Sequence, residues 1–243
     1  MNDPAPPQSP IPALLGSGVA RLDDVLGGGF TPHRLYLVEG KPGTGKTTLA
    51  LQFLMEGAQR GEQVLYVTLS ETADELAGVA RSHGWSLDAV HVREMLPAQD
   101  SLQPDEQYTM FHPSEVELGE TTLKILQDVE QLQPTRVVLD SLSELRLLAG
   151  SSLRFRRQIL ALKQFLAGRL CTVLLLDDMT TADHDLQVQS ISHAVLRLEQ
   201  TTSDFGAARR RLLVVKYRGQ AFRGGYHDYS IARGGMQVFP RLV

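Results

Sequence analysis

A regular alternation begins at Leu35, where short apolar runs are separated by longer segments whose apolar residues recur at helical spacing. Several runs are apolar at consecutive positions, as expected for strands that helices cover on both faces. The pattern predicts an α/β fold with a mostly parallel, twisted sheet flanked by helices. We expect strands at Leu35–Glu39, Val64–Leu69, Val90–Arg93, Val137–Asp140, Val173–Asp177, Ala194–Leu198 and Leu212–Tyr217, and helices at about Lys46–Arg60, Ala73–His83, Gly119–Leu132 and Ser152–Ala167.

Three segments depart from this alternation. Residues 1–13 are proline-rich, with five prolines within Met1–Pro12, which predicts a flexible or extended arm ahead of one domain at 14–243. The polar, aperiodic segment Pro97–Pro113 is too long for an ordinary connection and predicts a mobile surface loop or part of an interface. After Leu198, short β runs punctuated by glycine predict C-terminal hairpin strands at the sheet edge.

Composition limits the classes of partner. Of the 243 residues, 42% are hydrophobic and 21% are charged, as in a folded globular domain. The formal net charge of −4 gives no overall attraction to nucleic acid or to anionic membranes, so we expect neither as a partner. No apolar run approaches the roughly 20 residues of a membrane span, no targeting segment is recognisable, and Cys171 is the single cysteine. These features predict a cytoplasmic location.

The segment Gly40–Thr47, GKPGTGKT, matches the pattern GxxxxGK[ST]. It follows the predicted strand LYLVE and precedes the predicted helix TTLALQFL, the context in which this pattern forms a phosphate-binding loop. The two inner glycines permit the turn angles and the close approach to phosphate, Lys46 reaches the β- and γ-phosphates, and the next hydroxyl coordinates Mg²⁺. ATP and Mg²⁺ are therefore the predicted cofactors, with nucleotide contacts from Gly43, Thr44, Gly45, Lys46, Thr47 and Thr48.

Two carboxylates follow predicted strands near this loop. Asp140 ends the apolar run RVVLD, where open α/β sheets place their ligands, and is predicted to bind the nucleotide's Mg²⁺ through water. Glu71 follows the run QVLYVTL and is the candidate for orienting or deprotonating the attacking water, with a further contact to the metal. The alternative is that Glu71 only begins the next helix, TADEL, as an acidic first-turn residue.

Longer segments resemble one protein family. Ahead of the loop, GSGVARLDDVLGGGFTPHRLYLVEG resembles the corresponding segment of KaiC- and RadA-like ATPases of the RecA superfamily. Four further segments resemble KaiC specifically: TTLALQFL after the loop, ARSHGW at Ala80–Trp85, VVKYRG at Val214–Gly219 and MQVFPR at Met236–Arg241. By these motifs, about Leu15 to Val243 is identified as an ATPase domain of the KaiC family, which implies a RecA-like P-loop fold.

The resemblance implies how such a domain works. Family members form homohexameric rings with nucleotide between neighbours, and a Lys-x-Arg finger reaches the γ-phosphate of the adjacent subunit; the matching residues are Lys216, Tyr217 and Arg218. Nucleotide contacts are also implied at Ser82 and at Ala232–Arg233, where the family usually has Thr-Asp. The resulting catalytic set is Glu71, Lys46, Arg218 and Lys216.

The resemblance leaves several functions open. The family has two adjacent glutamates where this chain has Ser70 and Glu71, and hydrolysis would be slow if the first glutamate did the chemistry. The leading hypothesis is a nucleotide-driven switch or timer for KaiB-like or other signalling proteins. A RadA- or RecA-like recombinase is one alternative, and a Ser/Thr autokinase is another, although Ser190 and Ser192, near the family's phosphoacceptors, are more simply ordinary serines. The family also commonly joins a second such domain, which would follow Val243.

Overall fold

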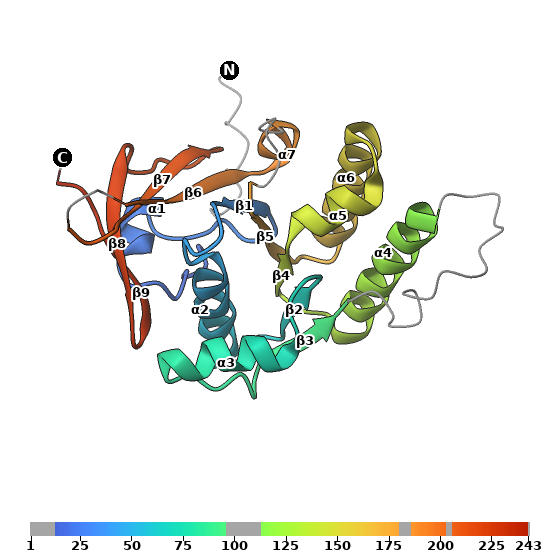
Figure 1. Cartoon of the computed structure of the whole chain (residues 1–243), viewed down its shortest axis with the longest axis horizontal. Coiled ribbons are helices and arrows are strands. Elements are labelled where there is room, and N and C mark those ends of the chain that lie inside the picture. The colour runs from blue at the N-terminus through green and yellow to red at the C-terminus, as the bar shows by residue number, and fades with distance from the viewer. Residues whose placement is uncertain (1–12, 96–112, 180–185, 203–205, 243) are drawn as a thin grey trace, which may run out of the picture.

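The computed structural model describes residues 13–95, 113–179, 186–202 and 206–242. Within these residues, one sheet of nine strands has the order β3-β2-β4-β5-β1-β6-β7-β8-β9 and carries helices on both faces (Figure 1). The strands are β1 (Leu35–Glu39), β2 (Val64–Thr68), β3 (His91–Glu94), β4 (Arg136–Asp140), β5 (Thr172–Asp177), β6 (Ala194–Thr201), β7 (Arg209–Tyr217), β8 (Tyr226–Ala232) and β9 (Gly235–Phe239). The helices are α1 (Leu22–Leu26), α2 (Lys46–Gln59), α3 (Ala73–His83), α4 (Pro113–Leu132), α5 (Leu142–Ala149), α6 (Ser152–Gly168) and α7 (Leu186–Ile191).

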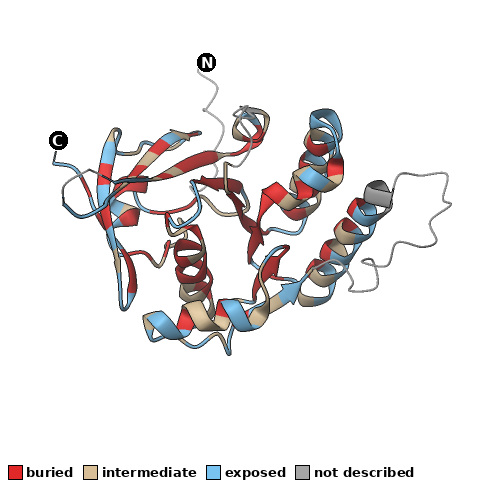
Figure 2. Ribbon diagram, in the orientation of Figure 1, coloured by how far each residue is buried: buried red, intermediate tan, exposed pale blue. Residues whose placement is uncertain are grey.

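The strands from β3 to β6 in this order form the parallel part of the sheet. Its central strands β1, β2, β4 and β5 are buried at every position (Figure 2). Alternate residues enter two separate hydrophobic clusters: Tyr36 and Val38 pack with α1 and α2, whereas Leu35 and Leu37 pack with α5 and α6. Burial on both faces explains why the sequence runs are apolar at consecutive positions.

The remaining strands form the antiparallel part of the sheet. β6 pairs with β7, β7 with β8, and β8 with β9, all antiparallel. Buried and exposed positions alternate along most of β8, as in a strand that is covered on one face. The predicted hairpins after Leu198 are thus confirmed. β7 begins at Arg209 and not at Leu212 because its first residues pair with the end of β6, where Arg209 lies opposite Thr201.

A few elements differ from the predictions. α4 begins at Pro113 instead of Gly119, which fits the tolerance of proline at the first helical position. The sequence analysis missed α5, whose eight residues lie between Ser141 and Gly150, the latter in the left-handed conformation at φ 63°. The proline-rich arm and residues 97–112 lie outside the described residues, so the expectations for both remain predictions.

The topology brings the carboxyl ends of β1, β2, β4 and β5 together. Glu39 lies in register with Asp177, and Thr68 with Asp140. We call this the carboxyl end of the sheet, and the opposite end, where β1 and β6 begin, the amino end. In open α/β sheets, ligands bind at the carboxyl end. In the ranges that the structure describes, no helix is both long and apolar enough to span a membrane.

Candidate nucleotide-binding site

The loop Gly40–Thr47 connects β1 to α2 at the carboxyl end of the sheet. Gly43 and Gly45 have left-handed φ angles of 83° and 96°, and a Cβ on Gly45 would lie only 2.4 Å from Cδ1 of Ile231. Because α2 begins at Lys46 and has 14 residues, its unpaired first-turn N–H groups face the loop. The loop therefore combines the two features that an anion site of this kind requires, glycine geometry and a helix N-terminus.

Lys46 is almost buried, with 6% of the residue exposed. Its Nζ atom donates hydrogen bonds to the carbonyl oxygens of Gly40 at 2.7 Å and Lys41 at 3.4 Å. It also forms an ion pair with Asp178, at 2.7 Å from Oδ1. Lys46 was predicted in the site, whereas Asp178 was not, because it directly follows the apolar run of β5 and meets the loop only in the folded chain.

Asp140 ends β4 and is 7% exposed. Tyr66 on β2 donates a hydrogen bond to its Oδ2 atom at 2.5 Å, and the Thr47 side chain lies beside both residues. Burial raises the pKa of Asp140 and the charge of Asp178 raises it further, while the bond from Tyr66 opposes both effects. The structure thus brings together the two residues predicted to hold Mg²⁺. Tyr66 was missed, because its contact depends on the neighbouring strand.

Glu71 lies close to this pair and is half-buried. Its Oε2 atom is buried and has no hydrogen-bond partner among the described residues. Burial raises the pKa of the Glu71 carboxyl, and the negative charge of Asp140 adds to that effect. The alternative that Glu71 begins the next helix is wrong, because α3 begins at Ala73, with Thr72 as its cap and Glu75 completing a capping box.

Two further carboxylates at the carboxyl end of the sheet have arginine partners. Glu39 forms an ion pair with Arg197 at 2.6 Å, and Asp177 forms one with Arg146 at 2.7 Å. In the described part of the chain, Glu71 and Asp140 have no such partner within 4.0 Å. The unpaired negative charge of the site therefore lies beside the lysine and the phosphate loop.

Polar contacts tie the loop and the first turn of α2 to β8. The Tyr229 hydroxyl donates to the carbonyl of Thr44 at 2.6 Å. The ring of His83 bridges two elements, with Nδ1 at 2.9 Å from the carbonyl oxygen of Ala232 and Nε2 at 3.4 Å from the hydroxyl of Thr48. Since a carbonyl only accepts, Nδ1 of His83 donates to Ala232.

The predicted nucleotide contacts Ser82 and Ala232–Arg233 lie next to His83. Ser82 is exposed at the end of α3, and its hydroxyl donates to the Val79 carbonyl at 2.7 Å. The Ala232–Arg233 pair lies beside the same helix end, because the amide of Gly234 donates to the carbonyl of His83 at 3.0 Å. Ser82 and Ala232–Arg233 are therefore neighbours, next to α2 and the phosphate loop.

The Lys-x-Arg motif lies at the amino end of the sheet. The Arg218 amide donates to the carbonyl of His193 at 3.0 Å, and its Nη2 atom donates to the carbonyl of Ser190 at 2.6 Å. Lys216, on β7, is half-buried. β1 begins at this end of the sheet and meets the phosphate loop at the other, so its five residues separate Arg218 from Gly40 by about 15 Å.

Tyr217 does not share the position of its neighbours, and the prediction that it contacts nucleotide is corrected for its side chain. Tyr217 is 7% exposed, and its hydroxyl accepts from the amide of Thr31 at 2.8 Å and donates to the carbonyl of Gly29 at 3.0 Å. Its ring packs edge-on against Tyr36. Alternation along β7 turns this residue inward, so its side chain fills the core of the subunit.

The two candidate phosphoacceptors, Ser190 and Ser192, each donate a hydroxyl hydrogen bond to a nearby backbone carbonyl. Ser192 is fully buried, and its hydroxyl donates to the Val188 carbonyl at 2.8 Å. Ser190 is exposed, and its hydroxyl donates to the Gln187 carbonyl at 2.7 Å. Both hydroxyls thus bond within α7 or directly after it.

A cavity of about 250 Å³ lies beside Arg218 at the amino end of the sheet. Three cationic side chains line it, those of Arg34, Lys163 and Arg218, and none of the residues that line it is acidic. His193 also lines it, and its Nε2 atom is buried without a partner among the described residues. Burial and then the charges of Arg34 and Arg218 lower the pKa of His193 to about 4. This end of the sheet therefore carries a cluster of positive charge.

The donors at the carboxyl end suit a magnesium nucleotide. Thr47 offers a hydroxyl oxygen and Asp140 a carboxylate, the type of ligand that Mg²⁺ prefers in combination with substrate phosphates and water. Among the residues that the structure describes, no group of three or more His, Cys, Asp or Glu could hold a metal ion by itself. Lys46 and the loop amides are placed for the phosphates themselves.

Comparison with known proteins gives the same assignment. A family model described as the KaiC ATPase matches residues 15–243. A UPF0273 protein of Methanopyrus kandleri is 29% identical in an alignment that covers 94% of this chain and 93% of that protein. The circadian clock oscillator protein KaiC of Picosynechococcus sp. is 27% identical over 93% of this chain, which spans 42% of that protein's length.

The fold agrees with a solved structure. The crystal structure of a KaiC-like protein from Pyrococcus horikoshii superposes with a TM-score of 0.77 at 23% identity, covering 95% of this chain and 100% of that one. The RecA-like P-loop fold, the phosphate loop with its carboxylates, and a family match over almost the whole described sequence point the same way. The chain belongs to the KaiC ATPase family.

Proposed function

We propose that this chain binds and hydrolyses ATP with Mg²⁺ at the interface between neighbouring subunits of a homohexameric ring, and that its nucleotide state acts as a switch or timer for partner proteins. The observation that carries the proposal is the division of the site between the two ends of the sheet. The phosphate loop lies at the carboxyl end, whereas Arg218 lies about 15 Å away at the amino end.

Within one subunit, the carboxyl end supplies binding and the activation of water. Lys46 and the loop amides bind the phosphates, and Thr47 with Asp140 would hold the Mg²⁺ that accompanies them. Glu71 is the group that orients or deprotonates the attacking water. Its raised pKa favours that role, because a carboxyl that holds a proton more tightly is a stronger base.

A neighbouring subunit supplies the positive charge that the site lacks. Arg218 is exposed, and among the residues that the structure describes its side chain bonds only to a carbonyl, so it keeps guanidinium donors for a phosphate oxygen. Contact between the amino end of one copy and the carboxyl end of the next is head-to-tail, and such a contact closes into a ring when the rotation between copies allows it. Arginines supplied in this way accelerate other NTPases by about 10³ to 10⁵.

A switch or timer follows from the same arrangement. A ligand that sits between two subunits changes the contact between them whenever its charge or its number of phosphates changes. Partner proteins that bind one state of the ring better than the other would then read the nucleotide state. The negative net charge gives no support to a nucleic-acid partner, so a signalling protein of the KaiB-like kind is the partner we propose.

The test is the mass in solution, measured by light scattering with and without ATP and Mg²⁺, together with phosphate release. A subunit of 26.8 kDa should assemble with nucleotide into a particle of six times that mass, and phosphate should appear only from the assembled fraction. A protein that stays monomeric with ATP and Mg²⁺, or a monomer with full activity, would contradict the proposal.

A further inference from the structure

Every donor of the phosphate-loop lysine is already engaged by the chain itself. An ammonium group has three N–H donors. The Nζ atom of Lys46 uses them on the carbonyls of Gly40 and Lys41, at 2.7 and 3.4 Å, and on the carboxylate of Asp178 at 2.7 Å. Asp178 is the only charged partner of the three. Phosphate oxygens can bind this lysine only if at least one of these contacts breaks. Charge balance favours loss of the ion pair with Asp178, because phosphate then replaces one negative group with another.

We propose that Asp178 is an internal competitor for nucleotide phosphate, and that it sets how strongly the site prefers ADP to ATP and how much it depends on Mg²⁺. This inference rests on the proposed function, since it concerns the same phosphate loop. The carboxylate of Asp178 lies against Lys46 where the β- and γ-phosphate oxygens must also approach. It is 27% exposed and follows β5 directly, so the side chain can turn away towards solvent.

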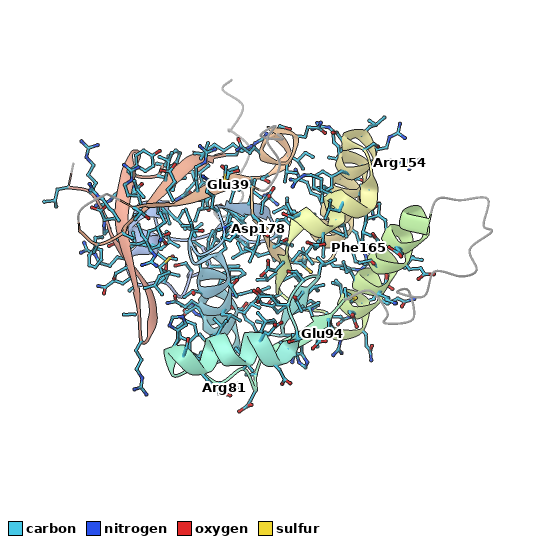
Figure 3. All side chains as sticks on the ribbon, viewed as in Figure 1. Glu39, Arg81, Glu94, Arg154, Phe165 and Asp178 are labelled. Carbon is cyan, nitrogen blue, oxygen red and sulfur yellow. The ribbon has the colours of Figure 1, made fainter. Side chains whose placement is uncertain are left out.

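The position of Asp178 among other charges makes the competition selective. Figure 3 shows Asp178 near Glu39 in the middle of the molecule, where Glu39 ends β1 and Asp177 ends the adjacent strand β5. Arg146 and Arg197 are paired with Asp177 and Glu39. A displaced Asp178 therefore faces the negative charges of Asp140 and Glu71.

The γ-phosphate makes this repulsion worse. ATP brings one more phosphate than ADP to the side of the lysine, and like charges placed a few ångströms apart repel strongly where water is partly excluded. A divalent cation on the phosphates offsets part of this charge. Removing the charge of Asp178 should accordingly help ATP more than ADP, and should help most when Mg²⁺ is absent.

The same ion pair also gives the nucleotide-free site a structural role. An almost buried lysine without a counter-ion is costly, and Asp178 supplies that counter-ion when no phosphate is present. A purely structural ion pair would predict that neutral variants are less stable and bind nucleotide no better. Competition predicts the same loss of stability without nucleotide, but together with tighter nucleotide binding.

Asp178→Asn is the deciding variant, and titration calorimetry with ATP and with ADP, each with Mg²⁺ or with EDTA, is the measurement. We expect about tenfold tighter ATP binding without Mg²⁺ and a smaller gain for ADP. Asp178→Ser provides a second neutral variant, and Asp178→Glu should bind as the wild type does. Asp128→Asn makes the same change of charge at the ion pair with Arg93, away from the loop, and should change neither affinity.

The outcomes separate this inference from the proposed function. Wild-type protein that binds neither nucleotide would overturn the proposed function itself. Wild-type protein that binds both, with neutral variants that bind equally or more weakly, would overturn only the role of Asp178. An equal gain for ATP and ADP at all Mg²⁺ concentrations would also contradict it, because the predicted selectivity comes from the γ-phosphate.

Discussion

The two ends of the parallel strands carry opposite charge. At the carboxyl end, Asp140 and Glu71 lie beside the phosphate loop, and burial followed by neighbouring negative charge raises their pKa values. At the amino end, burial followed by the charge of Arg218 lowers the pKa values of Lys163 and Lys216. Each end thus holds charges that destabilise one another. A second copy that presents its opposite end would relieve both, which supports the proposal that a complete site forms between two subunits.

The largest expected effect comes from removing the cation of the carboxyl end. Lys46→Ala should weaken nucleotide binding by more than about 100-fold, because no other side chain in the loop neutralises the β- and γ-phosphates. Calorimetric titration with ATP checks this. Lys41→Ala removes the same charge from an exposed position in the same loop and should bind nearly as the wild type does. Equal losses in both variants would show that general charge, and not the position of Lys46, governs binding.

Removing the Arg218 cation at the amino end should affect turnover and not nucleotide affinity. Arg218→Ala should lower the turnover number by about 10³, while nucleotide affinity changes little, because the arginine acts on charge that develops in the transition state. Steady-state phosphate release and equilibrium binding separate the two effects. Arg223→Ala, an exposed arginine nearby in the sequence, is the matched control. A similar loss of affinity in Arg218→Ala and Lys46→Ala would contradict the assignment of Arg218 to a neighbour's site.

Glu71→Gln tests whether the Glu71 carboxylate at the carboxyl end activates the attacking water. The amide keeps the shape but cannot take up a proton, so the turnover number should fall by about 10² with little change in KM. The exposed Asp74→Asn makes the same type of change in the first turn of α3 and should be neutral. Turnover unchanged in Glu71→Gln would assign the attacking water to another group.

The smallest predicted effect concerns the histidine of the amino end. Burial and nearby cations place the pKa of folded His193 at about 4, below its ordinary value of 6.5, so the unfolded chain takes up the proton first. The stability linked to His193 is present above pH 6.5 and is lost as the pH falls towards 4. His193→Phe should make this loss shallower by about 1 kcal/mol after solvent screening.

Denaturant unfolding between pH 7 and pH 4 measures this effect, with the exposed His91→Phe as the control. Identical pH profiles for the wild type and His193→Phe would mean that burial and the nearby cations together do not lower the pKa of His193.

Sequence patterns predicted the fold where burial is complete. β1 and α3 have the predicted bounds because consecutive apolar residues mark a doubly covered strand and a capped amphipathic run marks a helix. α5 was missed, since eight residues give too little period to distinguish a helix from a continuation of the strand before it. The first residues of β7 were missed because their strand character comes from pairing with β6, which no local pattern records.

The residues of the site also fall into those that a local pattern predicts and those that it does not. Lys46 and Thr47 belong to a contiguous motif, so the sequence alone identified them. Tyr66, His83 and Asp178 act through partners that are distant in sequence, and no local pattern marks a tyrosine on a strand or a second aspartate after one. Tyr217 shows the converse error: it belongs to a functional motif, but strand alternation turns its side chain into the core.

The central claim, that one subunit's carboxyl end is completed by another's amino end, is tested most directly by mixing two inactive variants. Lys46→Ala subunits keep the arginine, and Arg218→Ala subunits keep the phosphate loop. In a ring assembled from equal amounts, roughly a quarter of the interfaces regain both groups, so phosphate release should rise well above that of either variant alone. Activity in the mixture equal to the average of the two separate variants would contradict the account.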